Sequence, residues 1–519
     1  MTTPGRDTGV VPAEEVPRPA APATGPLAAD DARHTAIVSL GQASAMVMGG
    51  VIALLIAHIF GKSARTDAFF AAYGVATVVI IFGQTFRLTA LPKLMDPSDR
   101  AAPVRLLAAV GVIALAAAIP MVALADPVAS LLVKDDPGGV AAHSLRILWL
   151  AVAGQLFGSM LAAILATRGR FVLIGVTYLV AGIASVVVFL ALESAVGIES
   201  VAIGIDAGAV LLAGTFLWAL LADGLHSGGG SDGFRSVVRE VRDLTLASMT
   251  YVALNVGYVI CVAVASRAGS GEATLYAYAY FSAAILVAMT ATSAAMVRSP
   301  RLLSEEARSP RVMAQSSLAT YRVTVVVVMP VLALAALVGQ PVLAFVLGGA
   351  FGHDDTVRLV VTLLLLSGWV LGTAAGTFAV VELLARGQLR ALALIAVAQV
   401  LLLAPLAIAG REAWGIRGIA VAQSVSILAA TAAQLFLAFG RDAPRVGRHM
   451  AADTARALGA MAVAFAPSVA LVLALGYEPA VVAPAAVLAA GSALVATRVA
   501  WPDEWRLLAS VVRRRAVTA

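Results

Sequence analysis

Four polar side chains interrupt long apolar runs of the sequence and are the residues best placed to do chemistry. Arg87 is the one basic residue inside a predicted membrane span, where it could hold a phosphate group or reach the interface with its long side chain. Asp206 and Asn255 could line a polar cavity, and Asp206 is the better candidate for binding a coupling ion. Asp67 follows a threonine at the start of an apolar run, so it could act on a substrate or cap its own helix.

Two further arginines, Arg146 and Arg267, lie at the outer ends of predicted spans, where they could contact a departing head group or anchor the helix ends. Motifs of catalysis are absent: the sequence has no GxxxxGK[ST] loop and no HExxH pair, and its carboxylates lack metal-ligand spacing. The single cysteine, Cys261, cannot build a disulfide framework. We therefore expect no catalytic residue, no metal and no cofactor.

The elements that position these residues must be helices that cross a membrane. Of the 519 residues, 61% are hydrophobic and 13% are charged, which excludes a soluble globular enzyme. A bilayer core of about 30 Å requires roughly 20 apolar residues per helix, and we count fourteen such stretches along the chain. The sequence predicts an all-α polytopic membrane protein with about fourteen transmembrane helices.

The distribution of positive charge predicts the orientation of the chain. The formal net charge is +6, and most of the 36 lysines and arginines fall in alternate segments between the apolar stretches and in the C-terminal tail. The positive-inside rule then places both termini in the cytoplasm. Topology accounts for the basic charge, so we do not expect nucleic acid as a partner.

An internal repeat divides the spans into two lobes. One set of residues recurs after 208 positions and a second set recurs after 218 positions. The first set is Ala57, Gly61, Thr66, Pro92 and Leu94, and the second is Arg168, Gly169, Gly197, Ile198 and Ala202. Each copy holds six helices, so we expect two lobes related by an axis along the membrane normal, followed by two C-terminal helices.

The repeat and the charged segments predict six regions along the chain. A disordered cytoplasmic tail at 1–33 precedes the N-lobe, and a basic tail that suits an anionic lipid surface ends the chain. The remaining regions are the N-lobe at 34–222, a glycine-rich cytoplasmic linker at 223–243, the C-lobe at 244–440, helices 13 and 14 at 441–499, and the basic tail at 500–519.

Five motifs follow one another in the order and spacing of a known transporter family. They are IFGKSARTDAFFAAY (59–73), ATRGRF (166–171), GEATLYAYA (271–279), FVLGGAFGHDD (345–355) and LLARGQ (383–388). On these motifs the sequence resembles the MviN/MurJ lipid II flippases, within the superfamily of multidrug, oligosaccharidyl-lipid and polysaccharide exporters. The resemblance implies a scaffold and a transport activity rather than an enzyme.

The resemblance also implies a substrate and a place of action. The expected substrate is the peptidoglycan precursor lipid II, an undecaprenyl-pyrophosphate-linked saccharide, moved from the inner to the outer leaflet of a bacterial plasma membrane by alternating access. Helices 13 and 14 would then form a groove for the lipid tail, as they do in the family. The partners would be this lipid-linked substrate, the bilayer and, as a further option, proteins of cell-wall synthesis.

This sequence departs from the family at the arginines that line the transport cavity. By register on the motifs, their positions hold Met46, Ile52, Phe281 and a residue near Ile80, and Phe281 is retained as a candidate cavity residue. A guanidinium suits pyrophosphate because it offers a fixed fork of donors. Three alternatives therefore stay open: a flippase for another polyprenyl-linked glycan, a drug or cation antiporter, and a non-transporting scaffold paralogue for cell-wall synthesis.

Overall fold

The structure is a computed structural model, and its description covers most of the chain. The described residues are 48–80, 82–83, 86, 90, 93–94, 99, 101–134, 136–224, 234–292, 310–347, 351–475 and 479–502. Arg87, Met46, the predicted N-terminal tail and nearly all of the predicted C-terminal tail lie outside these residues.

The N-lobe is built from helices that cross back and forth and are joined by short turns. These are the helix Met48–Phe60, α2 (Ala64–Ile80), α4 (Ala102–Ala123), α5 (Ala125–Leu132), α6 (Val140–Thr167), α7 (Phe171–Val196) and α8 (Glu199–Ala222). Glycines with positive φ form the turns after α6 and α7, at Gly169 and Gly197. Glycine favours such turns because it has no Cβ that would clash there.

The C-lobe and the last two helices follow the same plan. The C-lobe contains α9 (Phe234–Ala265), α10 (Glu272–Val287) with the π-helical segment η1 (Ala288–Thr292), α12 (Pro310–Val346), α13 (His353–Leu365), α14 (Ser367–Ala385), α15 (Leu389–Trp414) and α16 (Ile416–Phe439). After the short 3-10 turn η3 (Gly440–Asp442) come α17 (Ala443–Leu475) and α18 (Pro479–Ala500).

The prediction of an all-α membrane protein is confirmed. Eleven helical segments of the described chain are long and apolar enough to cross a membrane, and one of them, Ile416–Leu475, contains both α16 and α17. The helix Met48–Phe60 is shorter but also apolar. Each of the fourteen apolar stretches counted in the sequence contains a helix, and the described residues form no strand.

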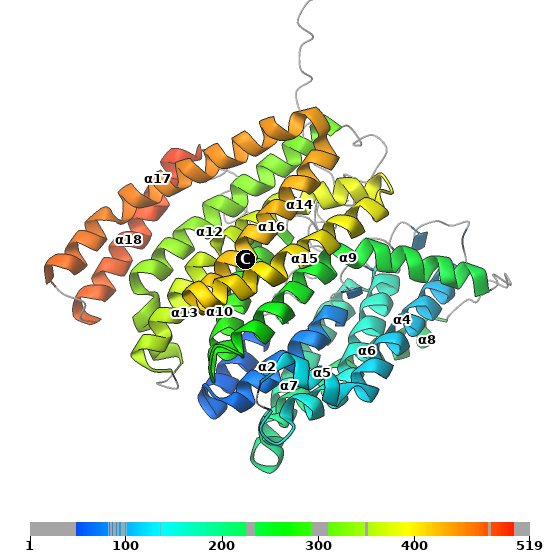
Figure 1. The fold of residues 1–519 in the computed structure, drawn as a ribbon. Helices are drawn as coiled ribbons and strands as arrows, with labels where there is room; N and C mark the ends of the chain where they lie inside the picture. Colours follow the sequence, from blue (N-terminus) through cyan, green and yellow to red (C-terminus); the bar gives the residue numbers. More distant parts are fainter. Residues whose placement is uncertain are drawn as a thin grey trace, which may run out of the picture.

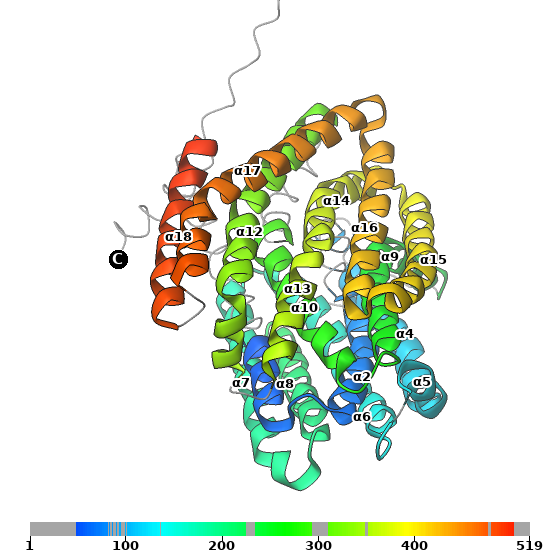
Figure 2. The same ribbon diagram turned by 60° about the vertical axis from the view of Figure 1, so that its left-hand side comes forward.

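The predicted repeat is visible in how the helices pair. In the N-lobe α8 packs against α6 and α7, and in the C-lobe α16 packs in the same way against α14 and α15. Gly197 and Gly415, which are equivalent in the repeat, turn the chain with φ/ψ of 66°/−138° and 61°/−139°. Figure 1 shows the two lobes as separate groups of helices, with α17 and α18 at the edge of the bundle beside α12; Figure 2 shows the same edge after rotation.

The start of α9 lies inside the predicted cytoplasmic linker. The helix α9 begins at Phe234, inside the range 223–243, so the second half of that range is helical. The charged residues at the start of α9 belong to an amphipathic helix. Its Val237, Val241 and Leu244 pack against the core, and its Glu240 forms ion pairs with the N-lobe. The domain boundaries stay predictions.

Candidate functional site

The two lobes meet where the helix Met48–Phe60 turns into α2, at the end of the bundle that the charge pattern predicts to face outward. Gly61 turns the chain with a φ of 60°. Ser63 Oγ then accepts a hydrogen bond from the Thr66 N–H at 3.2 Å, and Thr66 Oγ1 donates to the Gly61 carbonyl at 3.0 Å. These local bonds start α2 and place Asp67 in its first turn, toward the C-lobe.

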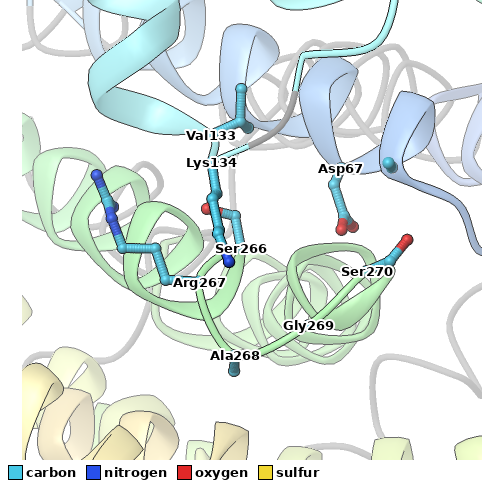
Figure 3. Close-up of a pocket in the computed structure, with 9 residues that line it drawn as sticks. Asp67, Val133, Lys134, Ser266, Arg267, Ala268, Gly269 and Ser270 are labelled. Atoms are coloured by element: carbon cyan, nitrogen blue, oxygen red, sulfur yellow. The ribbon is translucent and has the colours of Figure 1, made fainter.

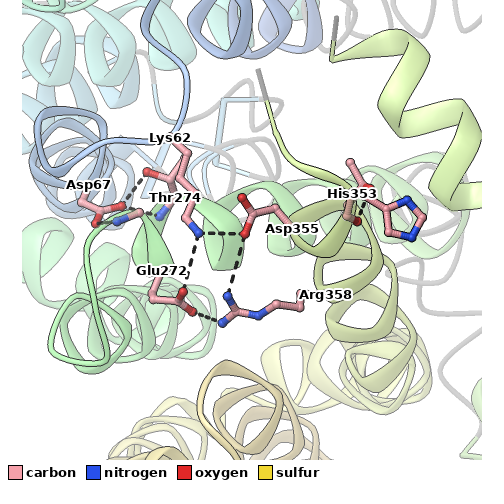
Figure 4. Close-up of polar contacts among 9 residues, drawn as sticks. Lys62, Asp67, Glu272, Thr274, His353, Asp355 and Arg358 are labelled. Carbon is pink, nitrogen blue, oxygen red and sulfur yellow. Dashed lines mark hydrogen bonds and ion pairs between the residues drawn. The ribbon is translucent and has the colours of Figure 1, made fainter. Parts of the chain in front are cut away.

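Asp67 caps the start of α10 across the interface between the lobes. Its Oδ2 accepts the Gly271 N–H at 2.6 Å, and its Oδ1 accepts the Thr274 N–H at 2.7 Å and Thr274 Oγ1 at 2.5 Å (Figure 4). The first N–H groups of a helix have no partner within it, and negative charge is favourable there. Asp67 is 4% exposed. It caps α10, whereas one of the two sequence alternatives was a cap on its own helix, α2.

Four charged side chains beside this cap bind the same two lobes together. Lys62 Nζ of the N-lobe lies 2.8 Å from Asp355 Oδ1 and 3.7 Å from Glu272 Oε1. Arg358 pairs with Glu272 and lies 3.8 Å from Asp355 Oδ1 (Figure 4). We call these four residues the outer ion cluster. They are partly buried, so salt screens them less than it would screen surface pairs.

Gly271 is required between the cap and the outer ion cluster for two reasons. Its φ of 79° lies in the left-handed region, which disfavours residues with a Cβ. A Cβ built at this position would also collide with the side chain of Lys62. The absence of a side chain therefore lets Lys62 cross the start of α10 to reach Asp355.

A pocket of about 260 Å³ opens beside Asp67 at the same end of the bundle (Figure 3). Lys134 and Arg267 line it, and the Arg267 guanidinium points away from Asp67. Arg267 donates to the Ala263 carbonyl at 2.6 Å and to the Leu131 carbonyl at 2.8 Å, so it fastens the end of α9 to the end of α5. Within the described chain Lys134 has no side-chain partner, which leaves its charge available to an anion.

An aromatic layer continues the interface one to two turns farther along α2 and α10. The Phe281 ring lies 6.0 Å from the rings of Phe70 and Tyr73 on α2 and 5.3 Å from Tyr258 on α9. Tyr258 in turn stacks on Tyr280 at 4.6 Å. Where the family resemblance places a cavity arginine, this chain therefore has an apolar ring packed between the lobes.

A second set of ion pairs joins the lobes at the predicted inner end. Glu240 of α9 lies 2.5 Å from Lys93 Nζ and 3.2 Å from Arg105 Nε, and both cations belong to the N-lobe. Arg105 is also 2.5 Å from Asp99. The Glu240 side chain is 6% exposed. We call these four residues the inner ion cluster.

The remaining sequence candidates lie apart from the interface contacts. Arg146 forms an exposed pair with Asp126 at 2.6 Å. Asn255 donates to the carbonyl of Tyr251 one turn earlier in its own helix, at 3.0 Å. Asp206 is buried in α8 against α6, and Arg87 falls outside the described residues. Of the candidates, the structure thus brings Asp67 and Arg267 to one pocket and Phe281 to the nearby aromatic layer.

Sequence reasoning missed most partners of Asp67 and Lys62. Glu272 and Thr274 stand in one of the quoted motifs and Asp355 in another, but none of them was singled out. The signal that could have found these partners was the presence of charged residues in loops that otherwise match a transporter family. Nothing in the sequence states which charges meet across the interface.

Comparison with protein families identifies the chain. The family model described as "Lipid II flippase MurJ" matches residues 56–483, which is most of the sequence. The chain belongs to the MurJ lipid II flippase family. Membership of this transporter family, together with the apolar helices, makes it a multipass protein of the inner membrane.

Solved structures agree with the MurJ fold. A lipid II flippase MurJ in an "inward closed conformation" superposes with a TM-score of 0.70 at 16% identity, covering 90% of this chain and 99% of that one. A transporter of the MOP superfamily from Pyrococcus furiosus gives 0.59 at 12% identity, covering 81% and 96%. An outward-facing multidrug resistance transporter of the MATE family gives 0.58 at 13% identity, also covering 81% and 96%. No curated protein sequence matches the chain.

Proposed function

We propose that this chain moves a polyprenyl-pyrophosphate-linked saccharide, lipid II on the strength of its family, from the inner to the outer leaflet by alternating access. The observation that carries the proposal is the Asp67 cap, through which one lobe completes the first turn of a helix in the other. Such a contact exists only while the lobes are together at that end. It is the kind of reversible closure that two rocking lobes require.

A closed cavity is needed because the head group is strongly polar. Sugars and phosphates lose their hydrogen bonds to water in hydrocarbon, and each lost bond costs free energy unless the protein replaces it. We assign Arg87 as the replacement for the missing family arginines, because the sequence places it inside a predicted span rather than at the end of one. Lys134, in the pocket beside Asp67, would meet the phosphates as they leave.

The lipid tail would stay in the membrane, along an apolar groove outside the lobes. A pocket of about 350 Å³ lies between α12, α17 and α18 and is lined by side chains such as Val327, Pro330, Phe465 and Leu494. Its walls are almost entirely apolar, as an isoprenoid chain requires. The positive-inside pattern supports an orientation in which both termini are cytoplasmic and the Asp67 end faces outward.

The test is translocation of fluorescent lipid II in reconstituted vesicles, with lipids retained by the purified protein identified by mass spectrometry. We expect the wild type to expose lipid II to an external quencher and to retain it on purification. Arg87→Ala should lose both, and the control Arg146→Ala, whose pair with Asp126 is exposed, should keep both. Protein that neither moves nor retains any polyprenyl-linked lipid would contradict the proposal and favour a non-transporting scaffold.

A second substrate is favoured by one observation. The aromatic layer at Phe281 stands where the family has a cavity arginine, so the head group binding site differs from that of its relatives. A flippase for another polyprenyl-linked glycan fits this difference. Retention of that glycan in place of lipid II, with Arg87→Ala again losing it, would identify this substrate. Transport of organic cations instead would indicate an antiporter.

A further inference from the structure

Asp206 is a carboxyl group in the interior of the N-lobe that the proposed transport path does not use. It lies in α8, is 8% exposed, and its Oδ1 accepts a hydrogen bond from the Ala151 N–H of α6 at 2.7 Å. Within the described residues this is its one hydrogen bond, and no cation pairs with it. A buried ionised carboxylate with a single partner is costly inside a membrane protein and calls for a function.

The repeat shows what this position does in the other lobe. At the spacing of 218 residues, Ser424 of α16 is equivalent to Asp206, and Trp369 of α14 is equivalent to Ala151. Ser424 Oγ accepts the Trp369 N–H at 3.1 Å and donates to the Leu365 carbonyl at 2.8 Å. In both lobes, therefore, a side chain from the sixth helix accepts a hydrogen bond from the backbone of the fourth.

The fourth helix, whose backbone bonds this side chain, is broken in the C-lobe and continuous in the N-lobe. The Ser424 hydroxyl bridges an N–H and a carbonyl four residues apart, at the place where the helix breaks between α13 and α14 at Leu366. Insertion of a side chain into this ladder of hydrogen bonds is a known cause of kinks. The helix α6 is continuous through the equivalent place, although Asp206 already holds the Ala151 N–H.

The chemistry of the two side chains explains the difference. A serine hydroxyl both donates and accepts, whereas an ionised carboxylate only accepts, so Asp206 in that form cannot bond a carbonyl. A protonated carboxyl group has an acceptor and a donor, as serine has. We propose that Asp206 is a proton-binding site, and that proton uptake lets it bridge the Ala151 N–H and the Ile147 carbonyl and so break α6 as Ser424 breaks its helix.

The surroundings favour a proton over a metal cation. The partner of Asp206 is an N–H group, which would repel a cation, and no group of three His, Cys, Asp or Glu residues in the described chain could hold a metal ion. None of the titratable or charged side chains on α8 or on the helices packed against it pairs with Asp206. These side chains are His143 and Arg146 of α6, Tyr178 and Glu193 of α7, and Glu199 of α8.

Because α6 and α8 are closely packed, a kink in α6 would displace α8. A Cβ added to Gly154 of α6 would lie 2.9 Å from the backbone of Ala209 in α8, so these two helices are nearly in backbone contact. Because Ala209 follows Asp206 by less than one turn, a kink at Ala151 must shift α8 with it. Protonation at one carboxyl group would in this way change the shape of the N-lobe.

The first experiment measures proton binding directly. Infrared difference spectra of the purified full-length protein, recorded while the pH is lowered, should show the C=O stretch of a newly protonated carboxyl group. Other carboxyl groups of the chain protonate as well, so the contribution of Asp206 is the part of the band that is missing in Asp206→Asn. That part should be retained in Glu382→Gln, because Glu382 is also buried but has Arg386 as its ion partner at 2.5 Å. Persistence of the full band in Asp206→Asn would overturn the proton site.

The second experiment measures the break in α6. Hydrogen exchange of the segment 147–155, corrected for the intrinsic effect of pH, should rise at least tenfold as wild-type protein is acidified. Asp206→Ser, which copies the C-lobe residue, should be folded and exchange fast at every pH, and Ser424→Asp should transfer the pH dependence to the α13–α14 junction. Exchange that is independent of pH in the wild type would overturn the hinge. Neither experiment needs a substrate, so the result stands apart from the proposed transport.

Discussion

The two ends of the lobe interface are closed by different kinds of contact. At the predicted outer end, Asp67 accepts three hydrogen bonds from the first turn of α10, and the outer ion cluster supports them. At the predicted inner end, Glu240 is held by Lys93 and Arg105 through ion pairs between flexible side chains. Hydrogen bonds to fixed backbone groups depend on direction as well as distance. The outer closure should therefore break as a unit, whereas the inner one should loosen gradually.

The largest effect is expected from Asp67→Ala. This change leaves the Gly271 and Thr274 N–H groups without an acceptor while the lobes are together, at a cost of about 1–3 kcal/mol for each buried group. Since roughly 1.4 kcal/mol is a factor of ten in an equilibrium, the closed outer end should become at least tenfold less populated. The yield of a short thiol cross-linker between Ala64→Cys and Ser270→Cys, which both line the pocket beside Asp67, measures the population of the closed outer end.

Asp67→Asn is the matched control for that experiment. Its amide oxygen still accepts one N–H bond but brings no charge to the helix start, so cross-linking should fall between the wild type and Asp67→Ala. If Asp67→Ala cross-links as well as the wild type, the cap does not hold the lobes together and the contrast between the two ends fails.

Glu240→Gln should have the next largest effect, and at the other end only. The change leaves Lys93 and Arg105 as neighbouring positive charges, although Arg105 keeps Asp99. We expect local destabilisation of about 1–3 kcal/mol, seen as faster hydrogen exchange over the segment 234–244. Outer cross-linking should stay at the wild-type level. A loss of outer cross-linking in Glu240→Gln would show that the two closures are coupled.

Lys62→Ala should weaken the outer end less than the loss of the cap. Lys62 is 19% exposed and its pairs are partly solvated, so we expect a loss of about 1 kcal/mol or less in the stability of the closed outer end.

Raising the salt from 0.1 to 1 M, which shortens the Debye length from about 10 to about 3 Å, should loosen the inner end more than the outer end. Equal salt effects at both ends would remove the distinction.

Arg146→Ala should have the smallest effect. The side chains of Arg146 and its partner Asp126 are 40% and 70% exposed, and the pair lies away from both closures. Pairs of this kind contribute from zero to about 1 kcal/mol, so thermal stability, outer cross-linking and inner exchange should match the wild type. A clear loss of cross-linking would show that the outer ends of α5 and α6 take part in closure.

The sequence predicted the fold far better than the site. Spans follow from runs of apolar residues, and the repeat follows from spacings of 208 and 218, so both could be found without a structure. The same spacing pairs Asp206 with Ser424, but the meaning of that pair came only with the backbone bonds each makes. That the charged part of the predicted linker begins a helix, α9, came with the structure, because a charged run can be a loop or the amphipathic start of a helix.

The sequence by itself determined the membrane class, the two lobes and the family, because hydrophobicity, periodicity and motif order are properties of contiguous segments. Only the tertiary structure decided that Asp67 caps a helix whose Thr274 is 207 positions away, and that Lys62 reaches Asp355, 293 positions away. Such pairs depend on the relative position and orientation of packed helices, which must be correct to within the length of a hydrogen bond. No local pattern carries that information, because many arrangements of the same helices bury the same apolar faces.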